Sequence, residues 1–389
     1  MAAPMHLSIL RVLAVVSGSI TVASIAYCLL SLRAAARFLG RRFDPPHSRD
    51  GPGLSLLKPL KGADRELYAA LRSHCVQDYP QYEILFGVTQ ANDPAADLVR
   101  KLIEEFPECK LELVNCDQRL GANGKVSTLA QLARLARHEV LLVNDSDIRV
   151  PPDYLRRISS ELQVPETGMV TCLYRGLAAP TLASRLEALT ISTDFIPGVL
   201  VASLIERGLH FGLGSTLAFR RRELQAIGGF EAIVDYLADD YELGRRISEQ
   251  GLKVELSSTV VETHIPGYSL AEFISHQLRW ARTIRASRPG GYAGLLLTFT
   301  LPWALAALIF ARGSGGAWFL LAAALLARIA VAITSCRLVL QDRKTFHSLW
   351  LLPVRDFVVV LVWIGGLVGN QVRWRGEKFS LECGKLRPL

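Results

Sequence analysis

The chain of 389 residues has little cysteine and little charge, and each shortage excludes a class of protein. Its seven cysteines are scattered, odd in number and never spaced C-x-x-C, so neither a disulfide scaffold nor a zinc ribbon is expected. Charged residues make up 21% and the mean hydropathy is +0.26, which is too apolar for a disordered chain and too charged for one embedded in a membrane throughout. The pattern G-x-x-x-x-G-K-[ST] is also missing, which disfavours a P-loop NTPase.

What the chain does have is an excess of basic residues, 44 Lys and Arg against 36 Asp and Glu, for a net charge of +8. A basic balance suits nucleic acid, an anionic membrane surface or an anionic substrate. Much of this excess lies beside long apolar stretches and in the tail after residue 371. We therefore expect a bilayer surface and an anionic substrate as partners, and no nucleic acid.

The first apolar stretch, residues 12–32, carries no charge and can cross roughly 30 Å of hydrocarbon as a helix. The basic residues that follow it directly are Arg33, Arg37, Arg41 and Arg42. By the positive-inside rule, the domain after them lies in the cytoplasm. A cleaved signal peptide fits poorly, because the run is long and its arginines lie on the C-terminal side. Residues 1–50 are thus expected to form a transmembrane anchor with a basic juxtamembrane segment.

A second apolar block fills residues 291–389 up to a basic tail. Residues 295–311 and 317–335 are candidate spans, and Arg328 inside the second must face a partner helix or lipid headgroups. Residues 349–369 are a weaker candidate, since they contain a proline and two charges, and a re-entrant or interfacial helix is an alternative. If all four segments crossed the membrane, the basic tail would lie outside the cytoplasm, contrary to the positive-inside rule. We therefore expect this last segment not to cross.

Residues 51–290 have the composition of a globular domain. Short apolar runs alternate there with helical segments, and the runs are residues 55–59, 82–89, 110–116 and 138–144. This alternation predicts an α/β fold with a mainly parallel sheet. Ligands of such sheets bind beyond the carboxyl ends of the strands, so functional residues should lie in the loops that follow the runs.

Acidic residues occupy two of these loops. Asp93 follows the second run, and Asp145 and Asp147 follow the fourth as a D-x-D pattern. Two carboxylates at a sheet edge can hold a hard divalent cation and, through it, phosphate oxygens. The alternative is an acid pair that caps the helix near residue 152, although Asp153 is itself a candidate for that cap.

Two further motifs carry a lysine and a pair of acids. Lys125 ends the sequence GANGK near a predicted helix start, where it can meet a phosphate; a plain glycine turn is the alternative. In DDYE, repulsion between Asp239 and Asp240 can raise one pKa toward the range of a general base. Acids in the first turn of a solvated helix explain that motif equally well.

The sequence HQLRW, residues 276–280, stands just before the second apolar block. Arg279 can pair with a diphosphate and Trp280 can stack on a sugar or a lipid. Basic residues here can instead anchor the chain to anionic lipid. Residues 191–209 are apolar with a few polar positions and fit either an interfacial helix that lines the path of a lipid or a core helix.

Together these motifs resemble the inverting GT-A glycosyltransferases of the ceramide glucosyltransferase type, and within them most closely the bacterial hopanoid-biosynthesis branch. The sequences VTQANDPAADL, GANGKVSTL, LLVNDSDIRVPPDYL, YLADDYELG and HQLRW occur in the order of that family. The resemblance covers nearly the whole chain, including the N-terminal anchor and the WRGEKFSL tail.

The resemblance implies a GT-A nucleotide-sugar-binding domain joined to transmembrane helices, with a UDP-sugar as donor and a membrane lipid as acceptor. It implies that Asp93 contacts the nucleoside and that Lys125 lies near the uracil or the diphosphate. It implies that Asp145 and Asp147 hold Mg²⁺ or Mn²⁺ against the diphosphate, with Asp145 also a substrate contact. It implies that Asp240 is the general base for the acceptor hydroxyl.

The same resemblance implies that His276, Arg279 and Trp280 bind donor and acceptor. His276 departs from the family motif (Q/R)-x-x-R-W, whereas Asp147 retains an acid that the animal ceramide enzymes lack. The hopanoid branch implies N-acetylglucosamine on a hopanoid polyol, and the ceramide branch implies glucose on ceramide. The implied location is the bacterial inner membrane, with residues 51–290 in the cytoplasm.

Three alternatives remain at this point. A processive polysaccharide synthase shares the acidic motifs, but its channel needs more spans than this chain offers. A membrane-anchored phosphohydrolase can use a D-x-D pair as nucleophile and acid, although Arg149 stands where such enzymes usually have Thr or Val. The third alternative is a non-enzymatic interaction protein in which the acids have no catalytic role. Replacing Asp240 by Asn would then leave the binding of its partner unchanged.

Overall fold

The computed structural model describes residues 3–41, 51–374 and 376–389, so Arg42 of the basic cluster lies outside the described residues. The chain forms two compact units. The membrane-helix unit comprises Met1–Arg41, Ala178–Leu204 and Gly267–Asn370, and the sheet unit comprises Arg42–Leu177, Ile205–Pro266 and Gln371–Leu389. Two stretches within 51–290, residues 178–204 and 267–290, therefore belong to the membrane-helix unit.

The sheet unit is built on eight strands in the order β3-β2-β1-β4-β7-β6-β8-β5. Their bounds are β1 Leu54–Pro59, β2 Tyr82–Val88, β3 Lys110–Asn115, β4 Val140–Val143, β5 Ile148–Arg149, β6 Thr167–Ala178, β7 Leu217–Arg220 and β8 Lys253–Ile265. The helices are α2 Leu67–Cys75, α3 Pro94–Glu105, α4 Gly124–Leu135, α5 Tyr154–Leu162, α8 Arg221–Ala226 and α9 Asp239–Glu249, with a 3-10 turn, η2, at Phe230–Ile233.

The four strands predicted from the apolar runs all form, and they pair in parallel as β3-β2-β1-β4. The expectation of a mainly parallel sheet is wrong for the other half, where β7 runs antiparallel to β4 and β6, and β5 antiparallel to β8. Helical crossovers impose the parallel pairs, whereas β7 follows an excursion of the chain through the membrane-helix unit. The fold class, α/β, is as predicted.

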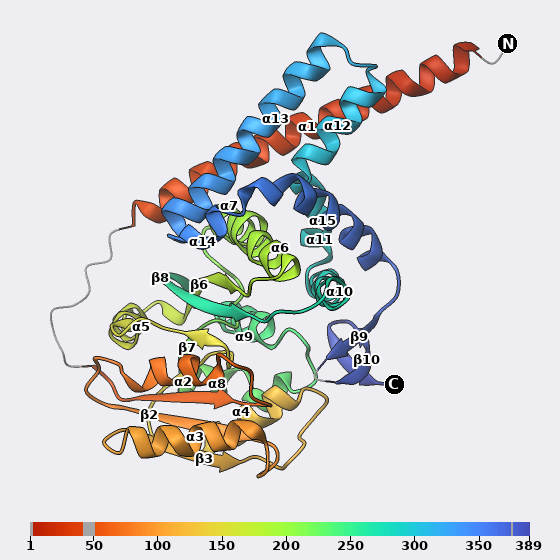
Figure 1. Ribbon diagram of the computed structural model, residues 1–389. Helices are drawn as coiled ribbons and strands as arrows, with labels where there is room; N and C mark the ends of the chain where they lie inside the picture. The colour runs from red at the N-terminus through yellow and green to blue at the C-terminus, as the bar shows by residue number, and fades with distance from the viewer. Residues whose placement is uncertain (1–2, 42–50, 375) are drawn as a thin grey trace. The chain divides into compact units, whose positions relative to one another are not determined.

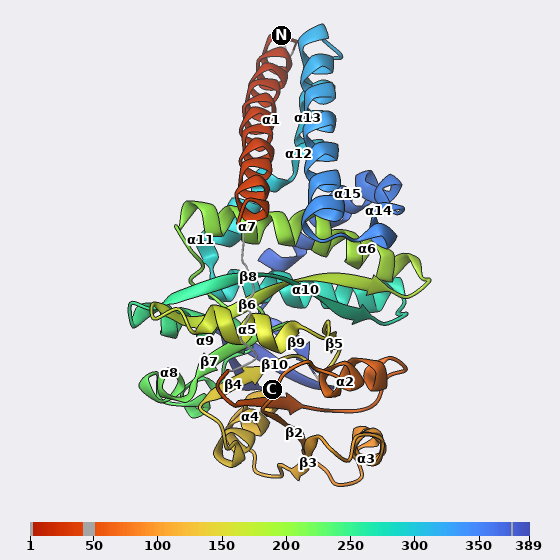
Figure 2. The same cartoon turned by 90° about the vertical axis from the view of Figure 1, so that its left-hand side faces the viewer.

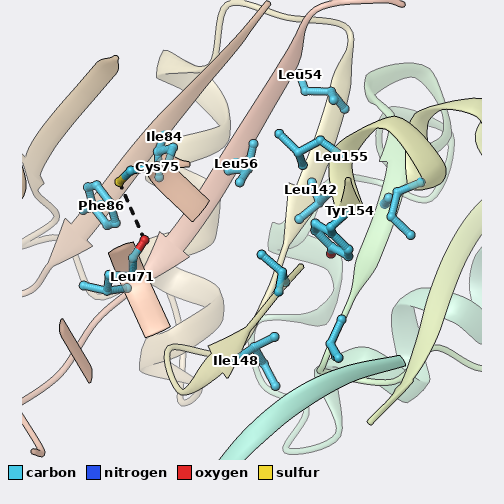
Figure 3. Packing of buried hydrophobic residues seen from close by; sticks show 14 of the residues in the cluster. Leu54, Leu56, Leu71, Cys75, Ile84, Phe86, Leu142, Ile148, Tyr154 and Leu155 are labelled. Carbon is cyan, nitrogen blue, oxygen red and sulfur yellow. Dashed lines mark hydrogen bonds between the residues drawn. The ribbon is translucent and has the colours of Figure 1, made fainter. Parts of the chain in front are cut away.

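The core of the sheet unit lies between strands and helices (Figure 3). Leu56, Ile84 and Leu142 come from β1, β2 and β4, and they share one buried cluster with Leu71 of α2 and Tyr154 of α5. All five side chains are fully buried. Strands covered on both faces need continuous apolar runs, which is why these segments were recognisable from their composition.

The last residues form a separate antiparallel sheet of three strands, in the order β11-β10-β9. The bounds are β9 Gln371–Trp374, β10 Glu377–Glu382 and β11 Lys385–Pro388 (Figure 1). We call these strands the tail sheet, and they belong to the sheet unit.

In the membrane-helix unit, the long helix α1 lies beside α12 and α13 (Figures 1 and 2). The helices of this unit are α1 Ala3–Leu39, α6 Leu182–Thr190, α7 Ile196–Ile205, α10 Leu270–Ser287, α11 Pro289–Gly294, α12 Thr300–Phe310, α13 Gly315–Ile333, α14 Arg343–Phe346 and α15 Leu352–Leu367. Two π-helical turns, η1 Ile191–Phe195 and η4 Thr334–Val339, and two 3-10 turns, η3 Leu295–Thr298 and η5 Leu349–Leu351, connect them.

By length and composition, four helical segments within the described residues can cross a membrane: Ser8–Leu39, Leu182–Ile205, Gly315–Val339 and Leu349–Leu367. A fifth is possible if the pair Pro289–Thr298 and Thr300–Phe310, bent by 57°, counts as one span. The candidate span predicted over residues 295–311 is therefore not one straight helix, because the bend falls within it.

Arg328 of α13 faces a partner helix rather than lipid headgroups. Its guanidinium donates to both carboxylate oxygens of Asp356 on α15, over 3.0 and 2.9 Å, and to the carbonyl oxygen of Thr193 over 2.6 Å. Arg355, next to Asp356, pairs with Asp194 of η1 over 2.8 Å. Charges that would be costly in hydrocarbon are therefore paired inside the unit.

Candidate active site

The D-x-D pair lies in a tight turn between β4 and β5. The backbone N–H of Asp145 donates to the carbonyl oxygen of Gly214 over 3.0 Å, and the Asp145 carbonyl accepts from Ile148 N–H. The Asp147 carboxylate accepts a hydrogen bond from the Thr263 hydroxyl over 2.5 Å. Burial, and next to it the Asp145 charge, raises the pKa of Asp147. Neither acid caps α5, and Asp153 makes no side-chain cap bond either.

Lys125 joins this turn to the second acidic motif. Its Nζ lies 2.7 Å from Asp145 Oδ1 and 2.8 Å from Asp239 Oδ2. Asn123 caps α4 by accepting from Val126 N–H, which sets Lys125 in the first turn of that helix. Burial disfavours the lysine's charge, but the surrounding carboxylates outweigh it and raise the pKa of Lys125. The GANGK loop is thus more than a glycine turn.

Asp240 stands in the first turn of α9, as the helix-start interpretation expects, yet it also faces the cluster. Its Oδ2 accepts from Gly214 N–H over 2.9 Å and its Oδ1 accepts from Tyr241 N–H over 2.8 Å. Burial and the neighbouring Asp239 raise the pKa of Asp240 to about 6. A carboxyl with that pKa is mostly ionised at neutral pH and still a usable proton acceptor.

Gly214 is a residue that the motif analysis missed. A Cβ added there would lie 2.6 Å from Asp145 Oδ2 and 3.4 Å from Asp240 Oδ2. The two carboxylates therefore converge on one backbone position that has room for glycine alone. The available signal was the sequence GLGST before the apolar strand β7.

Lys58 is a second missed residue. It is the last residue but one of β1, is fully buried, and donates from Nζ to the Asp145 carbonyl over 2.9 Å. Burial lowers its pKa to about 7, although the Asp147 and Asp145 charges oppose that shift. The signal was a lysine within the apolar run SLLKP, which a buried strand does not tolerate without a partner.

Beneath the turn, Asn144 fixes the end of β4 through a buried network. Its side-chain oxygen lies 3.2 Å from His74 Nε2, and its Nδ2 donates to the Tyr154 hydroxyl over 2.9 Å. The Tyr154 hydroxyl lies 2.9 Å from the Thr216 hydroxyl. Burial holds the pKa of His74 well below its usual value, so this ring is neutral. These four residues come from distant segments, and no local pattern connects them.

Asp93 has a different set of contacts. It is the N-cap of α3, accepting from Ala95 N–H over 2.9 Å. Its two oxygens also accept from Gly62 N–H over 2.9 and 3.1 Å. The residue follows β2, so it shares the carboxyl edge of the parallel strands with Lys58 and the D-x-D turn.

His276, Arg279 and Trp280 all lie on α10, in the membrane-helix unit. His276 Nδ1 is 3.2 Å from the buried carboxylate of Glu187 on α6. The Trp280 ring packs against His276 with centroids 5.3 Å apart and against Phe195 with centroids 6.0 Å apart. Through these contacts, the HQLRW motif packs against α6 and η1 of the same unit.

The arginines just after that motif have a structural role. Arg282 donates to the carbonyl of Val368, and Arg285 donates to those of Leu367 and Gly369. These carbonyls belong to the last residue of α15 and to the two residues after it, where the carbonyls of a helix end lack partners within the helix. Cations at that end also favour the helix dipole. The arginines therefore cap α15, a role that the sequence did not indicate.

The acidic cluster fits a divalent cation by the chemistry of its donors. Among residues 3–41, 51–374 and 376–389, no group of three or more His, Cys, Asp or Glu side chains is arranged to hold a metal ion. Mg²⁺ in enzymes commonly takes one or two carboxylates and completes its shell with substrate phosphates and water. Asp145, with 43% of its side chain exposed, and Asp147 carry carboxylate oxygens of that kind.

Comparison with known proteins identifies the family of the chain. The description "Glycosyl transferase family 21" belongs to a family model that matches residues 16–387. Ceramide glucosyltransferase 1 of Caenorhabditis elegans is 23% identical over 350 residues, which cover 86% of this chain and 72% of that protein. Ceramide glucosyltransferase of Komagataella phaffii is 31% identical over 109 residues, 27% of this chain and 21% of that one.

Among solved structures, the mannosyltransferase PcManGT from Pyrobaculum calidifontis, in complex with GDP-Man and Mn²⁺, is similar with a TM-score of 0.56. The two chains are 20% identical, and the match covers 91% of this chain and 97% of that one. This likeness confirms the glycosyltransferase fold expected from the motifs.

Proposed function

Since the chain belongs to glycosyl transferase family 21 and is a glycosyltransferase with several apolar helices that can span a membrane, we propose that it moves a sugar from a UDP-sugar to a hydroxyl of a membrane lipid, with inversion at the anomeric carbon. The observation that carries this proposal is that Asp145 and Asp240 converge on Gly214, with Lys125 paired to Asp145. One cation and two carboxylates with different surroundings suit a reaction that needs a base on one side and an electrophile on the other.

Asp240 is the proposed general base. Its carboxylate takes the proton of the acceptor hydroxyl while the acceptor oxygen forms a bond to the anomeric carbon. The bond from that carbon to the diphosphate oxygen breaks on the opposite face, and UDP leaves. The pKa near 6 lets Asp240 enter the reaction ionised, and Gly214 N–H orients it.

Lys125 and the D-x-D turn are proposed to bind the diphosphate of the donor. Lys125 is a fixed cation, held by two carboxylates and set at the start of α4, where helix N–H groups also favour an anion. Asp145 and Asp147 are the proposed ligands of Mg²⁺ or Mn²⁺, and such an ion would offset charge on the diphosphate. Lys58 holds the Asp145 backbone in place from below. Asp93 is the proposed nucleoside contact.

The proposed acceptors are a hopanoid polyol, with N-acetylglucosamine as the sugar, and ceramide, with glucose. The second follows the relatives in Caenorhabditis elegans, whose names state that specificity. His276, Arg279 and Trp280 are proposed substrate-binding residues. The proposed location is the bacterial inner membrane with the sheet unit in the cytoplasm.

A donor and acceptor screen tests this function. We expect the full chain in detergent to release UDP and to place labelled sugar on an extractable lipid, in a reaction that stops when EDTA removes divalent metal. The donors are UDP-N-acetylglucosamine, UDP-glucose and GDP-mannose, and the acceptors are ceramide and a hopanoid polyol. Labelled sugar in an insoluble polymer would indicate a polysaccharide synthase instead, and an α-linked product from an α-linked donor would contradict inversion.

The helix α15 exposes large apolar side chains and buries two charged ones, the reverse of a helix at a water-exposed surface. Large apolar side chains are exposed along one face from the preceding turn to the helix end: Trp350, Val354, Phe357, Leu361, Ile364 and Val368, between 44% and 71% exposed. Their spacing of three and four residues forms a single stripe. Arg355 and Asp356 lie on the opposite, buried face.

That opposite face packs on α10, which limits how α15 can meet a bilayer. Contacts run along both helices, from Leu278 beside Gly365 to the hydrogen bond between Arg285 and the Leu367 carbonyl. If α15 crossed the bilayer, the arginines of α10 would enter hydrocarbon, at about 2.5–3.5 kcal/mol each near the centre. We therefore propose that α15 lies along the interface, with its stripe in lipid.

Depth measurements test this placement. In a cysteine-free background, spin labels at Val354, Leu361 and Ile364 should report similar, shallow depths of about 5–10 Å in reconstituted vesicles. Labels at Phe319 and Leu326 of α13, seven residues apart on a candidate span, serve as the control. They should differ by about 10 Å, given a rise of about 1.5 Å per residue. A Leu361 label near the bilayer centre would show that α15 crosses.

A further inference from the structure

The tail sheet, residues 371–388, contacts the segment that leads into the catalytic helix α9. We call that segment, residues 234–238, the connecting segment. Leu386 N–H donates to the Asp235 carbonyl over 2.7 Å, and Leu237 N–H donates to the Gly384 carbonyl over 3.1 Å. Between these bonds, Tyr236 and Lys385 form an isolated antiparallel bridge. β11 therefore binds the connecting segment through the backbone.

Side chains strengthen the same contact. Leu237 shares a buried cluster with four residues of the tail sheet: Val372, Phe379, Leu381 and Leu386. The Tyr236 ring receives Lys385 Nζ at 5.3 Å from its centroid and the Arg246 guanidinium at 5.6 Å. Burial of this apolar area removes the freedom that a five-residue connection would otherwise keep.

On its other side, the connecting segment holds the loop that presents Lys125. The Asp235 carboxylate accepts from Ala122 N–H over 2.9 Å. Asn123 N–H donates to the Val234 carbonyl over 2.8 Å, and Asn123 Nδ2 donates to the Tyr236 carbonyl over 2.7 Å. Asn123 is fully buried and is also the cap of α4.

One five-residue segment therefore fixes two catalytic elements together. It runs directly into Asp239 and Asp240, and through Asn123 it sets the start of α4 and hence Lys125. Lys125 and Asp239 must meet over 2.8 Å, a distance that small displacements of either helix would break. Of the contacts described above, those with the tail sheet join residues that are over 130 positions apart in the chain.

We propose that the tail sheet is a brace for the active site and that Asp235 is a positioning residue, since its carbonyl binds the brace and its carboxylate binds the GANGK loop. The assignment of catalytic roles to Lys125 and Asp240 rests on the proposed function, whereas the brace itself rests on the contacts above. Misplacing reacting groups by about 1 Å can lower turnover about 100-fold.

The test compares Asp235→Ala with Asp235→Asn in the full chain. The alanine variant leaves Ala122 N–H without its acceptor, so we expect kcat per UDP-binding site to fall about 10- to 100-fold. Asparagine keeps a side-chain oxygen and should restore most of that loss. Counting sites by UDP titration separates a positioning effect from loss of folded protein, because unfolded chains bind no UDP.

Hydrogen exchange gives a readout that does not depend on activity. In Asp235→Ala, and in Leu386→Pro, which lacks the N–H that binds Asp235, the amides of Ala122 and Asn123 should exchange faster than in the wild type. Amides of β1 and β2 should be unchanged.

Glu377→Ala is the matched control within the tail sheet. It removes the exposed ion pair with Arg119, which links the tail to the GANGK region but contributes little. This variant should match the wild type in both readouts. Unchanged exchange at Ala122 in both Asp235→Ala and Leu386→Pro would overturn the brace. If the wild type transfers no sugar but exchange responds as expected, the proposed function fails and the brace stands.

Discussion

Replacing Asp240 by Asn is expected to lower kcat for sugar transfer by about 10²- to 10⁴-fold, the usual contribution of a general base. The amide cannot accept the acceptor's proton. Its side-chain oxygen can still accept from Gly214 N–H, so the fold around it and the affinity for UDP should persist. Steady-state turnover and calorimetric titration with UDP measure the two effects separately.

Glu249→Gln is the control for that change, because it also converts a carboxylate to an amide, at the exposed end of the same helix. It should leave kcat unchanged. The wild type should also lose activity as pH falls through about 6, because the raised pKa means that Asp240 is protonated below that value. Wild-type turnover in Asp240→Asn would show that another group is the base.

Replacing Asp145 by Ala is expected to weaken UDP binding at a fixed Mg²⁺ concentration by at least about tenfold. Even groups that only support metal ligands contribute about 10- to 100-fold to metal affinity. The change also takes one carboxylate from Lys125, leaving the 2.8 Å pair with Asp239. Calorimetry with and without EDTA distinguishes the two losses, since the metal-dependent part disappears when EDTA is present.

Asp153→Ala is the control for Asp145→Ala. Asp153 lies in the same stretch of chain but pairs with Arg157, away from the cluster. Its loss should not alter UDP affinity. Equal UDP affinity in Asp145→Ala and the wild type, at the same metal concentration, would refute the metal role.

The local features of this molecule were predictable because they depend on neighbouring residues. The runs that became β1, β2 and β4 were recognisable because strands buried on both faces are largely apolar, whereas β3 at the sheet edge alternates between exposed and half-buried positions. Asn123 begins α4 where the GANGK motif predicted a helix start, because a cap bonds to N–H groups only two or three residues away. The apolar stretches 12–32 and 317–335 also became long helices.

Gly214 and Lys58 each have a local signal in the sequence, but that signal does not show what they contact. Their roles depend on Asp145, which is 69 and 87 residues away in the chain. A local motif cannot report which strand will be placed beside β4, and β7 reaches it only after the chain passes through the membrane-helix unit. The Arg282 and Arg285 side chains likewise cap a helix that begins 70 and 67 residues later.

By itself, the sequence determined the family, the α/β class, the apolar segments and the acids at the strand ends, because composition and short spacing carry that information. Only the tertiary structure decided which carboxylates meet Lys125, that Asp145 and Asp240 converge on Gly214, and that Arg328 pairs with Asp356. It also decided that the last strands of the chain hold the segment before Asp240. Such contacts join residues far apart in sequence, so they depend on how the elements pack and not on the pattern within any one of them.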